Sequence, residues 1–144
     1  MKVYKFGGAS VRNADGVRNL AHIVEGEENL FIIVSAMGKT TNALERVFGH
    51  MQNGRKEEAN EEIKQVQDYH AAIIDDLWGE PTNINEVTLL FGQLRNIVND
   101  IVYRQSDAEL WYDTIVAYGE LISTTIISKY LNHIGMRNRW IDMR

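Results

Sequence analysis

The apolar run at residues 30–34 limits the possible fold of this chain more than any other stretch. Its sequence, Leu-Phe-Ile-Ile-Val, is apolar at every position and is followed by Ser35. Uninterrupted runs of this kind are typical of strands in a parallel sheet that is covered on both faces. A shorter β-prone run, residues 3–6, precedes it and stops at Gly7-Gly8. The chain therefore begins with two predicted strands.

Helical patterns follow each of these runs. Asn13 or Asp15 can cap a helix whose apolar residues recur as far as Val24, and a second helix is predicted from about Thr41 to Met51. The resulting order is strand, helix, strand, helix. That order favours an α/β fold, a three-layer α/β/α sandwich with a parallel sheet and right-handed crossovers.

The middle of the chain is predicted to be helical. Apolar residues recur at helical spacing over residues 55–108, and the single proline, Pro81, separates two segments. We expect an antiparallel helical hairpin inserted in the α/β domain. A further helix is expected from about Leu110 to Leu131, closed by Gly135, and a third strand over residues 138–142.

The composition argues against several classes of partner. Asp and Glu outnumber Lys and Arg by 20 to 15, whereas nucleic acids and anionic membranes attract clustered Lys and Arg. No apolar run approaches the ~20 residues of a membrane span, and the chain has no cysteine for disulfides. We therefore expect a cytoplasmic protein with no nucleic acid or membrane partner. Its histidines share no metal-ligand spacing, so no metal site is expected.

The turn after the first predicted strand joins a cation to adjacent glycines, in the order Lys5-Phe6-Gly7-Gly8. Glycines at the carboxyl end of a strand let backbone N–H groups approach an anion closely, and a lysine supplies charge for a phosphoryl group. A tight turn with a surface lysine explains the same residues equally well. Taken alone, this turn leaves both interpretations open.

The turn after the second predicted strand contains Gly38-Lys39-Thr40, like the end of a P-loop. The P-loop pattern requires another glycine five positions before Gly38, where this chain has Ile33. The P-loop interpretation therefore fails. Either this small-residue turn, beginning at Ser35, offers hydroxyls to a polar ligand, or Thr40 or Thr41 simply begins the next helix.

Gly119 and Glu120 form a third notable stretch, inside an apolar helical run. Glycine in mid-helix costs about 1 kcal/mol relative to alanine, so Gly119 indicates a close backbone approach or the true start of the helix. The Glu120 carboxylate is either solvated at a helix end or directed at a cationic group of a ligand.

In this order, the three stretches resemble the amino-terminal part of an aspartokinase. The matching residues are Lys-Phe-Gly-Gly-Ala-Ser-Val at 5–11, Val-Ser-Ala-Met-Gly-Lys-Thr-Thr-Asn at 34–42, Tyr-Gly-Glu-Leu-Ile-Ser at 118–123 and the closing Trp-Ile-Asp-Met-Arg. The resemblance covers essentially the whole chain. It implies an incomplete amino-acid kinase (carbamate kinase-like) fold. It also implies the reaction ATP + L-aspartate → 4-phospho-L-aspartate + ADP, which leads to lysine, threonine and methionine.

The resemblance also implies roles for individual residues. Lys5–Gly8 would bind the phosphates of ATP, and Lys5 would act as the catalytic contact to the transferring phosphoryl group. Ser35, Thr41 and Glu120 would bind aspartate, with Glu120 holding its ammonium group. Mg²⁺ would accompany ATP on its phosphates, and a homodimer is compatible with the resemblance.

Two departures from the family pattern affect the expected activity. Ala9 stands where the family usually has threonine, which removes a hydroxyl beside the phosphates. In the family, the adenosine pocket, the arginine for the aspartate α-carboxylate, a further catalytic aspartate and the ACT regulatory domains follow the segment that corresponds to Arg144. We therefore expect residues 1–144 to be the first part of a kinase domain, with little turnover alone.

Two alternatives stay open at this stage. A non-catalytic interaction module would use the helical hairpin as its binding surface, and an exposed apolar stripe there would favour it. Another amino-acid kinase, acting on glutamate or carbamate, is the second alternative. The Gly119-Glu120 stretch and the hydroxyl-rich second turn favour an α-amino acid, with aspartate first.

Overall fold

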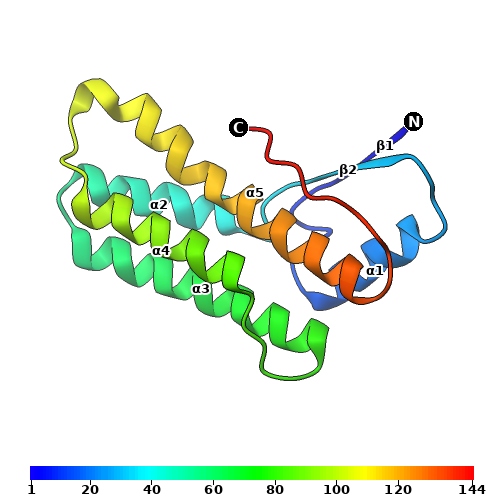
Figure 1. Ribbon diagram of the computed structural model, residues 1–144. Helices are drawn as coiled ribbons and strands as arrows, with labels where there is room; N and C mark the ends of the chain where they lie inside the picture. The colour runs from blue at the N-terminus through cyan, green and yellow to red at the C-terminus, as the bar shows by residue number, and fades with distance from the viewer.

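The computed structural model describes residues 1–144 and combines a small parallel sheet with a set of long helices (Figure 1). In chain order the elements are β1 (Lys2–Phe6), α1 (Ala14–Val24), β2 (Leu30–Val34), α2 (Thr40–Gln52), α3 (Lys56–Trp78), α4 (Asn85–Asp100), the 3-10 helix η1 (Gln105–Asp107) and α5 (Ala108–His133). This order confirms the predicted α/β class. None of these helices has the length and apolar character needed to cross a membrane.

The sheet consists of β1 and β2, which run parallel with Phe6 paired to Val34 at their carboxyl ends. Only one face is covered, because α1 and the end of α5 both lie on the same side of the strands (Figure 1). Val3 and Ile33 on the other face are 55% and 42% exposed. The expectation that residues 30–34 are covered on both faces is therefore wrong within this chain, because no layer packs on the second face.

The expected third strand at residues 138–142 is absent. This segment follows α5 without β pairing and is held by polar side chains. The Trp140 Nε1 donates to the Thr124 Oγ1 at 2.8 Å, and the Asn138 Nδ2 donates to the Ser128 carbonyl at 3.2 Å. An apolar and β-branched sequence forms a strand only where a neighbouring backbone pairs with it, and here the segment's bonds go to a helix instead.

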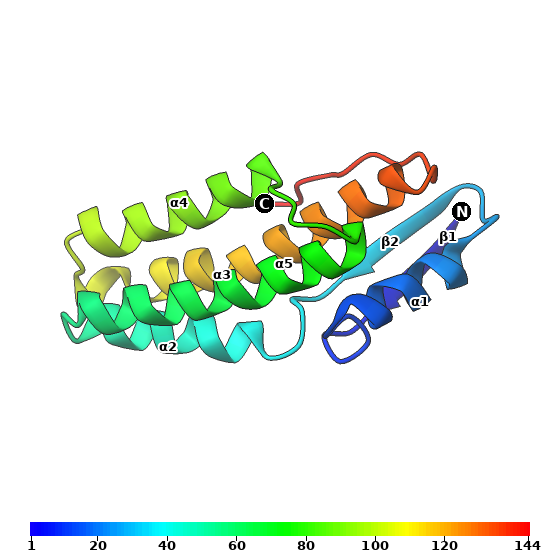
Figure 2. The same ribbon diagram turned by 90° about the horizontal axis from the view of Figure 1, so that it is seen from below.

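Helices α2 to α5 lie side by side and extend away from the sheet (Figure 2). The predicted hairpin is confirmed as α3 and α4, separated by the segment that contains Pro81. Gly79 ends α3 in the left-handed conformation, at φ 76°, and its N–H donates to the carbonyls of Asp75 and Asp76. α2 and α5 complete a four-helix bundle around the hairpin, an arrangement that the sequence reasoning did not predict.

The apolar stripes of the hairpin are buried within the bundle and share one core with α1, α2 and α5. Asn13 rather than Asp15 caps α1, since the Asn13 Oδ1 accepts from the Gly16 N–H at 2.9 Å. The buried residues of the hairpin are Ala59, Ile63, Val66, His70, Ile73, Ile74, Leu77, Val87, Phe91, Leu94 and Val98.

Candidate functional site

The turns that follow β1 and β2 are bonded to each other at the carboxyl edge of the sheet. The Ser35 N–H donates to the Phe6 carbonyl at 3.0 Å, and the Gly38 N–H donates to the Gly8 carbonyl at 3.0 Å. The parallel register explains this proximity, because it brings both carboxyl ends to the same edge. In open α/β sheets ligands bind at this edge.

The two glycines of the first turn have different surroundings. A Cβ on Gly8 would lie 2.6 Å from the Ala36 carbonyl oxygen and 3.0 Å from that of Gly38, so close packing with the second turn requires glycine at this position. A Cβ on Gly7 would meet no heavy atom within 4 Å. Gly7 therefore faces open space, where its backbone is accessible to a ligand.

Helix α5 packs directly against the second turn. The Ser123 Oγ donates to the Ser35 carbonyl at 2.9 Å, and a Cβ on Gly119 would lie 2.7 Å from the Ala36 Cβ. Gly119 therefore marks a close approach between elements rather than the start of α5, which begins at Ala108. This contact places Glu120 beside the second turn.

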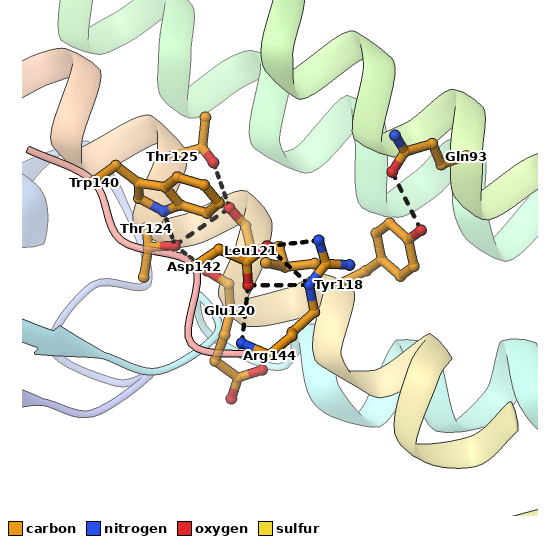
Figure 3. A network of polar contacts seen from close by, with 9 residues as sticks. All are labelled: Gln93, Tyr118, Glu120, Leu121, Thr124, Thr125, Trp140, Asp142 and Arg144. Atoms are coloured by element: carbon orange, nitrogen blue, oxygen red, sulfur yellow. Dashed lines mark hydrogen bonds and ion pairs between the residues drawn. The ribbon is translucent and has the colours of Figure 1, made fainter. Parts of the chain in front are cut away.

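The side chains predicted to bind ligand have no partners within the chain. Lys5, Ser35 and Glu120 are exposed and Thr41 is half-buried. None of their side-chain polar atoms takes part in a hydrogen bond or an ion pair. Figure 3 shows the Glu120 carboxylate directed away from the polar network that surrounds its own backbone.

The two threonines at the start of α2 differ in whether the hydroxyl has a hydrogen-bond partner within the chain. Thr40 begins the helix and is buried, and its Oγ1 donates to the Met37 carbonyl at 2.6 Å. The Thr41 hydroxyl makes no such bond. The structure thus assigns Thr40 to the fold and leaves Thr41 available to a ligand.

A groove of about 980 Å³ lies between β2, α5 and the C-terminal residues 135–144. Glu120 lines it, but Lys5, Gly7 and Ser35 do not. The predicted residues therefore share one edge of the sheet without enclosing a common pocket. Lys5 pairs with Ile33 in the sheet, which places it on the uncovered face.

Two ionisable side chains near Glu120, Asp142 and Tyr118, have shifted pKa values. Figure 3 shows where they lie. Hydrogen bonds from Arg144 hold the pKa of the Asp142 carboxyl below its ordinary value. Partial burial raises the pKa of the Tyr118 phenol, against the opposing charge of Arg144. Both the Asp142 carboxylate and the neutral Tyr118 phenol are thus favoured at neutral pH.

Sequence reasoning gave no role to Ser123 or Tyr69, and both contact the site loops. Ser123 is a small polar residue at a fully buried position of α5, and this pattern is a usable signal for a hydrogen bond between elements. Tyr69 lies next to the apolar stripe of α3, and its Oη donates to the Arg12 carbonyl in the first loop. Nothing in the sequence around Tyr69 indicates this contact.

A sequence model of the amino acid kinase family matches residues 1–144. The chain belongs to the amino acid kinase family. Among curated relatives, aspartokinase 1, chloroplastic, of Arabidopsis thaliana is 32% identical, over 97% of this chain and 25% of its own length. The lysine-sensitive aspartokinase 3 of Escherichia coli (strain K12) is 27% identical, over 99% of this chain and 31% of its own length. This amino acid kinase chain thus spans between a quarter and a third of these relatives.

Solved structures agree on the fold. The crystal structure of E. coli aspartokinase III in complex with aspartate and ADP superposes with a TM-score of 0.78 at 26% identity, covering 100% of this chain and 31% of that one. The aspartate kinase of Clostridium acetobutylicum gives a TM-score of 0.71 at 21% identity, covering 92% of this chain and 29% of its own. The amino acid kinase type of α/β fold expected from the sequence is confirmed.

Proposed function

We propose that this chain forms the phosphate-facing and aspartate-facing edge of an aspartate kinase, which converts ATP and L-aspartate to 4-phospho-L-aspartate and ADP. The observation that carries the proposal is the joining of three stretches at one sheet edge. The first turn bonds to the second through the Gly38 N–H and the Gly8 carbonyl, and α5 bonds to the second through Ser123. Relatives that match nearly the whole chain are named as aspartokinases.

The first turn would hold the transferring phosphoryl group. Gly7 is open to solvent, so its backbone can approach phosphate oxygens without a side chain in the way. The exposed Lys5 ammonium has no competing carboxylate and supplies positive charge at the same edge. Charge that develops on the phosphoryl oxygens would be stabilised there.

The second turn and α5 would hold aspartate. The unpartnered Ser35 and Thr41 hydroxyls can donate to a carboxylate, and Glu120 can accept from the substrate's ammonium group. The β-carboxylate of aspartate, with an ordinary pKa of about 3.9, is ionised at neutral pH. Its oxygen would attack the γ-phosphorus as the bond to the β-phosphate oxygen breaks, so no general base is required.

Mg²⁺ would arrive with the nucleotide. No three His, Cys, Asp or Glu side chains come close enough to hold a metal ion between them. Mg²⁺ commonly binds through substrate phosphates with few protein ligands, and such an ion would neutralise charge on the phosphates of ATP. The chain's own contribution is then alignment and the charge of Lys5.

A ligand titration followed by amide NMR tests the site. MgADP should shift the Gly7 and Gly8 amides, and Lys5→Ala should weaken that binding about tenfold or more because it removes a charge-assisted contact. Lys2→Ala is the matched control, since Lys2 lies at the other end of the same strand and pairs with Glu27. Equal MgADP affinity in both variants would contradict the role of Lys5.

L-aspartate and succinate distinguish the role of Glu120, because succinate lacks the ammonium group. Glu120→Gln should weaken aspartate binding and leave succinate binding unchanged. Glu109→Gln, at an exposed position in the first turn of α5, is the control. An equal loss for both ligands would show that Glu120 does not hold the ammonium group.

We infer little turnover by residues 1–144 alone, because Lys5, Ser35 and Glu120 all stand open to water, where charge stabilisation is weak. Trapping aspartyl phosphate with hydroxylamine checks this. The unaltered chain should yield no more trapped aspartyl phosphate than Lys5→Ala does. A yield clearly above that of Lys5→Ala would refute the inference. The cytoplasmic location and the homodimer stay predictions.

The interaction-module alternative requires an exposed apolar stripe on the helical hairpin. The apolar stripes of α3 and α4 are buried against the rest of the bundle. Among the large apolar residues of these two helices only Tyr69 and Leu89 are exposed. The hairpin therefore supports the fold of a kinase domain rather than presenting a binding stripe.

A further inference from the structure

Tyr69 connects the hairpin to the loops that follow both strands. It projects from α3, and its Oη donates to the carbonyl of Arg12 in the loop after the first turn. The same oxygen would lie 2.6 Å from a Cβ on Gly38 in the second turn. The Tyr69 hydroxyl thus bonds to the first loop and lies close to Gly38 in the second.

Backbone bonds extend each contact into the candidate phosphate site. The Ser10 N–H donates to the Gly7 carbonyl at 3.0 Å and the Val11 N–H to the Gly8 carbonyl at 3.3 Å, so the loop held at Arg12 is continuous with the glycine turn. On the other side the Gly38 N–H donates to the Gly8 carbonyl. Tyr69 therefore links two segments, the loop at Arg12 and the second turn at Gly38, each of which is bonded to the glycine turn.

The ring of Tyr69 is itself held in place. It packs edge-on against the buried His70 ring, with centroids 5.1 Å apart. Partial burial raises the pKa of the Tyr69 phenol, so the hydroxyl stays protonated and able to donate at neutral pH. The hydroxyl is a donor carried by a helix that packs in the bundle, and such an element can position a loop.

We propose that Tyr69 is a positioning residue that holds the glycine turn in register with the second turn, and so sets the geometry in which phosphate is bound. This inference rests on the proposed function, since it assigns phosphate to the glycine turn. It also gives the helical hairpin a second task beyond filling the core.

The test compares Tyr69→Phe with Tyr103→Phe in the full chain. Each change removes one phenolic hydroxyl that makes hydrogen bonds, and the Tyr103 hydroxyl bonds to Gln52 and Gln105. Loss of one hydrogen bond should weaken MgADP binding by Tyr69→Phe about three- to tenfold. Tyr103→Phe should bind MgADP like the unaltered chain. A merely structural tyrosine would lower the unfolding free energy without changing the affinity of the folded protein.

Amide hydrogen exchange provides a readout that does not depend on ligand. The Gly38 amide should exchange about three- to tenfold faster in Tyr69→Phe, with no matching change in Tyr103→Phe. A double-mutant cycle tests whether Tyr69 and Gly38 lie close to each other. Gly38→Ala places a Cβ against the Tyr69 Oη, so the two changes combined should destabilise less than the sum of the separate changes.

The outcomes separate the two proposals. If the unaltered chain shows no MgADP shifts at Gly7 and Gly8, the proposed function fails and the inference fails with it. If the unaltered chain binds MgADP and Tyr69→Phe binds it equally well, only the role of Tyr69 is overturned. Weaker binding together with faster Gly38 exchange, confined to Tyr69→Phe, supports the inference.

Discussion

At the scale of single residues, Gly7 and Gly8 need to be glycine for different reasons. A Cβ added to Gly8 would meet the Ala36 and Gly38 carbonyl oxygens, whereas a Cβ added to Gly7 would meet no heavy atom within 4 Å. A glycine required for close packing therefore lies next to a glycine that faces open space. The sequence shows two identical residues, and only the surroundings separate their roles.

This difference predicts opposite consequences for one substitution. Gly8→Ala should destabilise the fold by about 1–3 kcal/mol, because the new methyl meets backbone oxygens that cannot move freely. Gly7→Ala should change the unfolding free energy by less than about 1 kcal/mol but weaken MgADP binding. Urea unfolding and a ligand titration measure the two effects. A stable Gly8→Ala protein would contradict the packing argument.

Gly119 offers a second residue-scale prediction. Gly119→Ala gains up to about 1 kcal/mol of helix propensity but forces a methyl to 2.7 Å from the Ala36 Cβ, and overpacking of this kind costs about 1–3 kcal/mol. We expect net destabilisation and altered amide shifts at Ser35. Gly92→Ala in α4 is the control, because its methyl would meet nothing within 4 Å. That variant should be more stable than the unaltered chain by up to about 1 kcal/mol.

The residues of the candidate site differ in whether local sequence could predict them. Lys5, Ser35, Thr41 and Glu120 are predicted from the resemblance of three short stretches in order, and their binding roles stay predictions. The structure places these stretches at one sheet edge. Tyr69 could not be identified. Its contact with Arg12 spans 57 positions along the chain, and no local spacing encodes a contact that depends on how α3 packs.

At the scale of elements, α3 carries a buried titratable group. His70 is fully buried, its Nδ1 lies 2.7 Å from the Val66 carbonyl oxygen, and its Nε2 has no partner. Burial lowers the pKa of His70 from 6.5 to about 4, against a smaller opposing effect of the Val66 bond. The neutral imidazole is therefore the form that the bundle accommodates.

The sign of the resulting pH dependence follows from proton binding. Between pH 6.5 and about 4 the unfolded chain binds a proton at His70 and the folded chain does not, so the unfolding free energy falls as pH falls. The loss over that window is roughly 3 kcal/mol. His70→Leu should remove it, and urea unfolding between pH 7 and 4.5 measures the difference between the two proteins. Parallel pH profiles would contradict this prediction.

The helices were predictable because each carries its own signal. Apolar residues at helical spacing, Asn13 as a cap and the break before Pro81 indicate α1 to α5 from local sequence. The strand expected at residues 138–142 was not predictable in this way. A strand is completed by a neighbouring backbone, and here Trp140 and Asn138 bond to α5 instead.

At the scale of the whole molecule, burial is uneven. No residue of β1 is buried, and in β2 only Val34 is, at 5% exposed. The bundle, in contrast, contains fully buried residues along every helix, including Leu44, Ile63, Phe91 and Ile126. Apolar burial is the main source of stability, so we expect the part of the chain that carries the glycine turn to be the less stable part.

Amide hydrogen exchange should therefore show two parts of the molecule with different opening free energies. Amides of β1, α1 and β2 should exchange through openings of lower free energy than amides of α2 to α5. Two buried leucines provide a matched test, since Leu20 in α1 is 1% exposed and Leu94 in α4 is 0% exposed. Each change to alanine should cost about 2–5 kcal/mol at its site.

The two substitutions differ in how far their effect spreads. Leu20→Ala should speed exchange in β1, α1 and β2 and leave the bundle amides protected, because the bundle can stay folded while the sheet opens. Leu94→Ala should speed exchange everywhere, because the sheet packs on α5 and has no core of its own. A common exchange free energy for both parts in the unaltered chain would mean that the sheet and the bundle unfold together. The site turns would then be as rigid as the core, and ligand binding would add little protection to them.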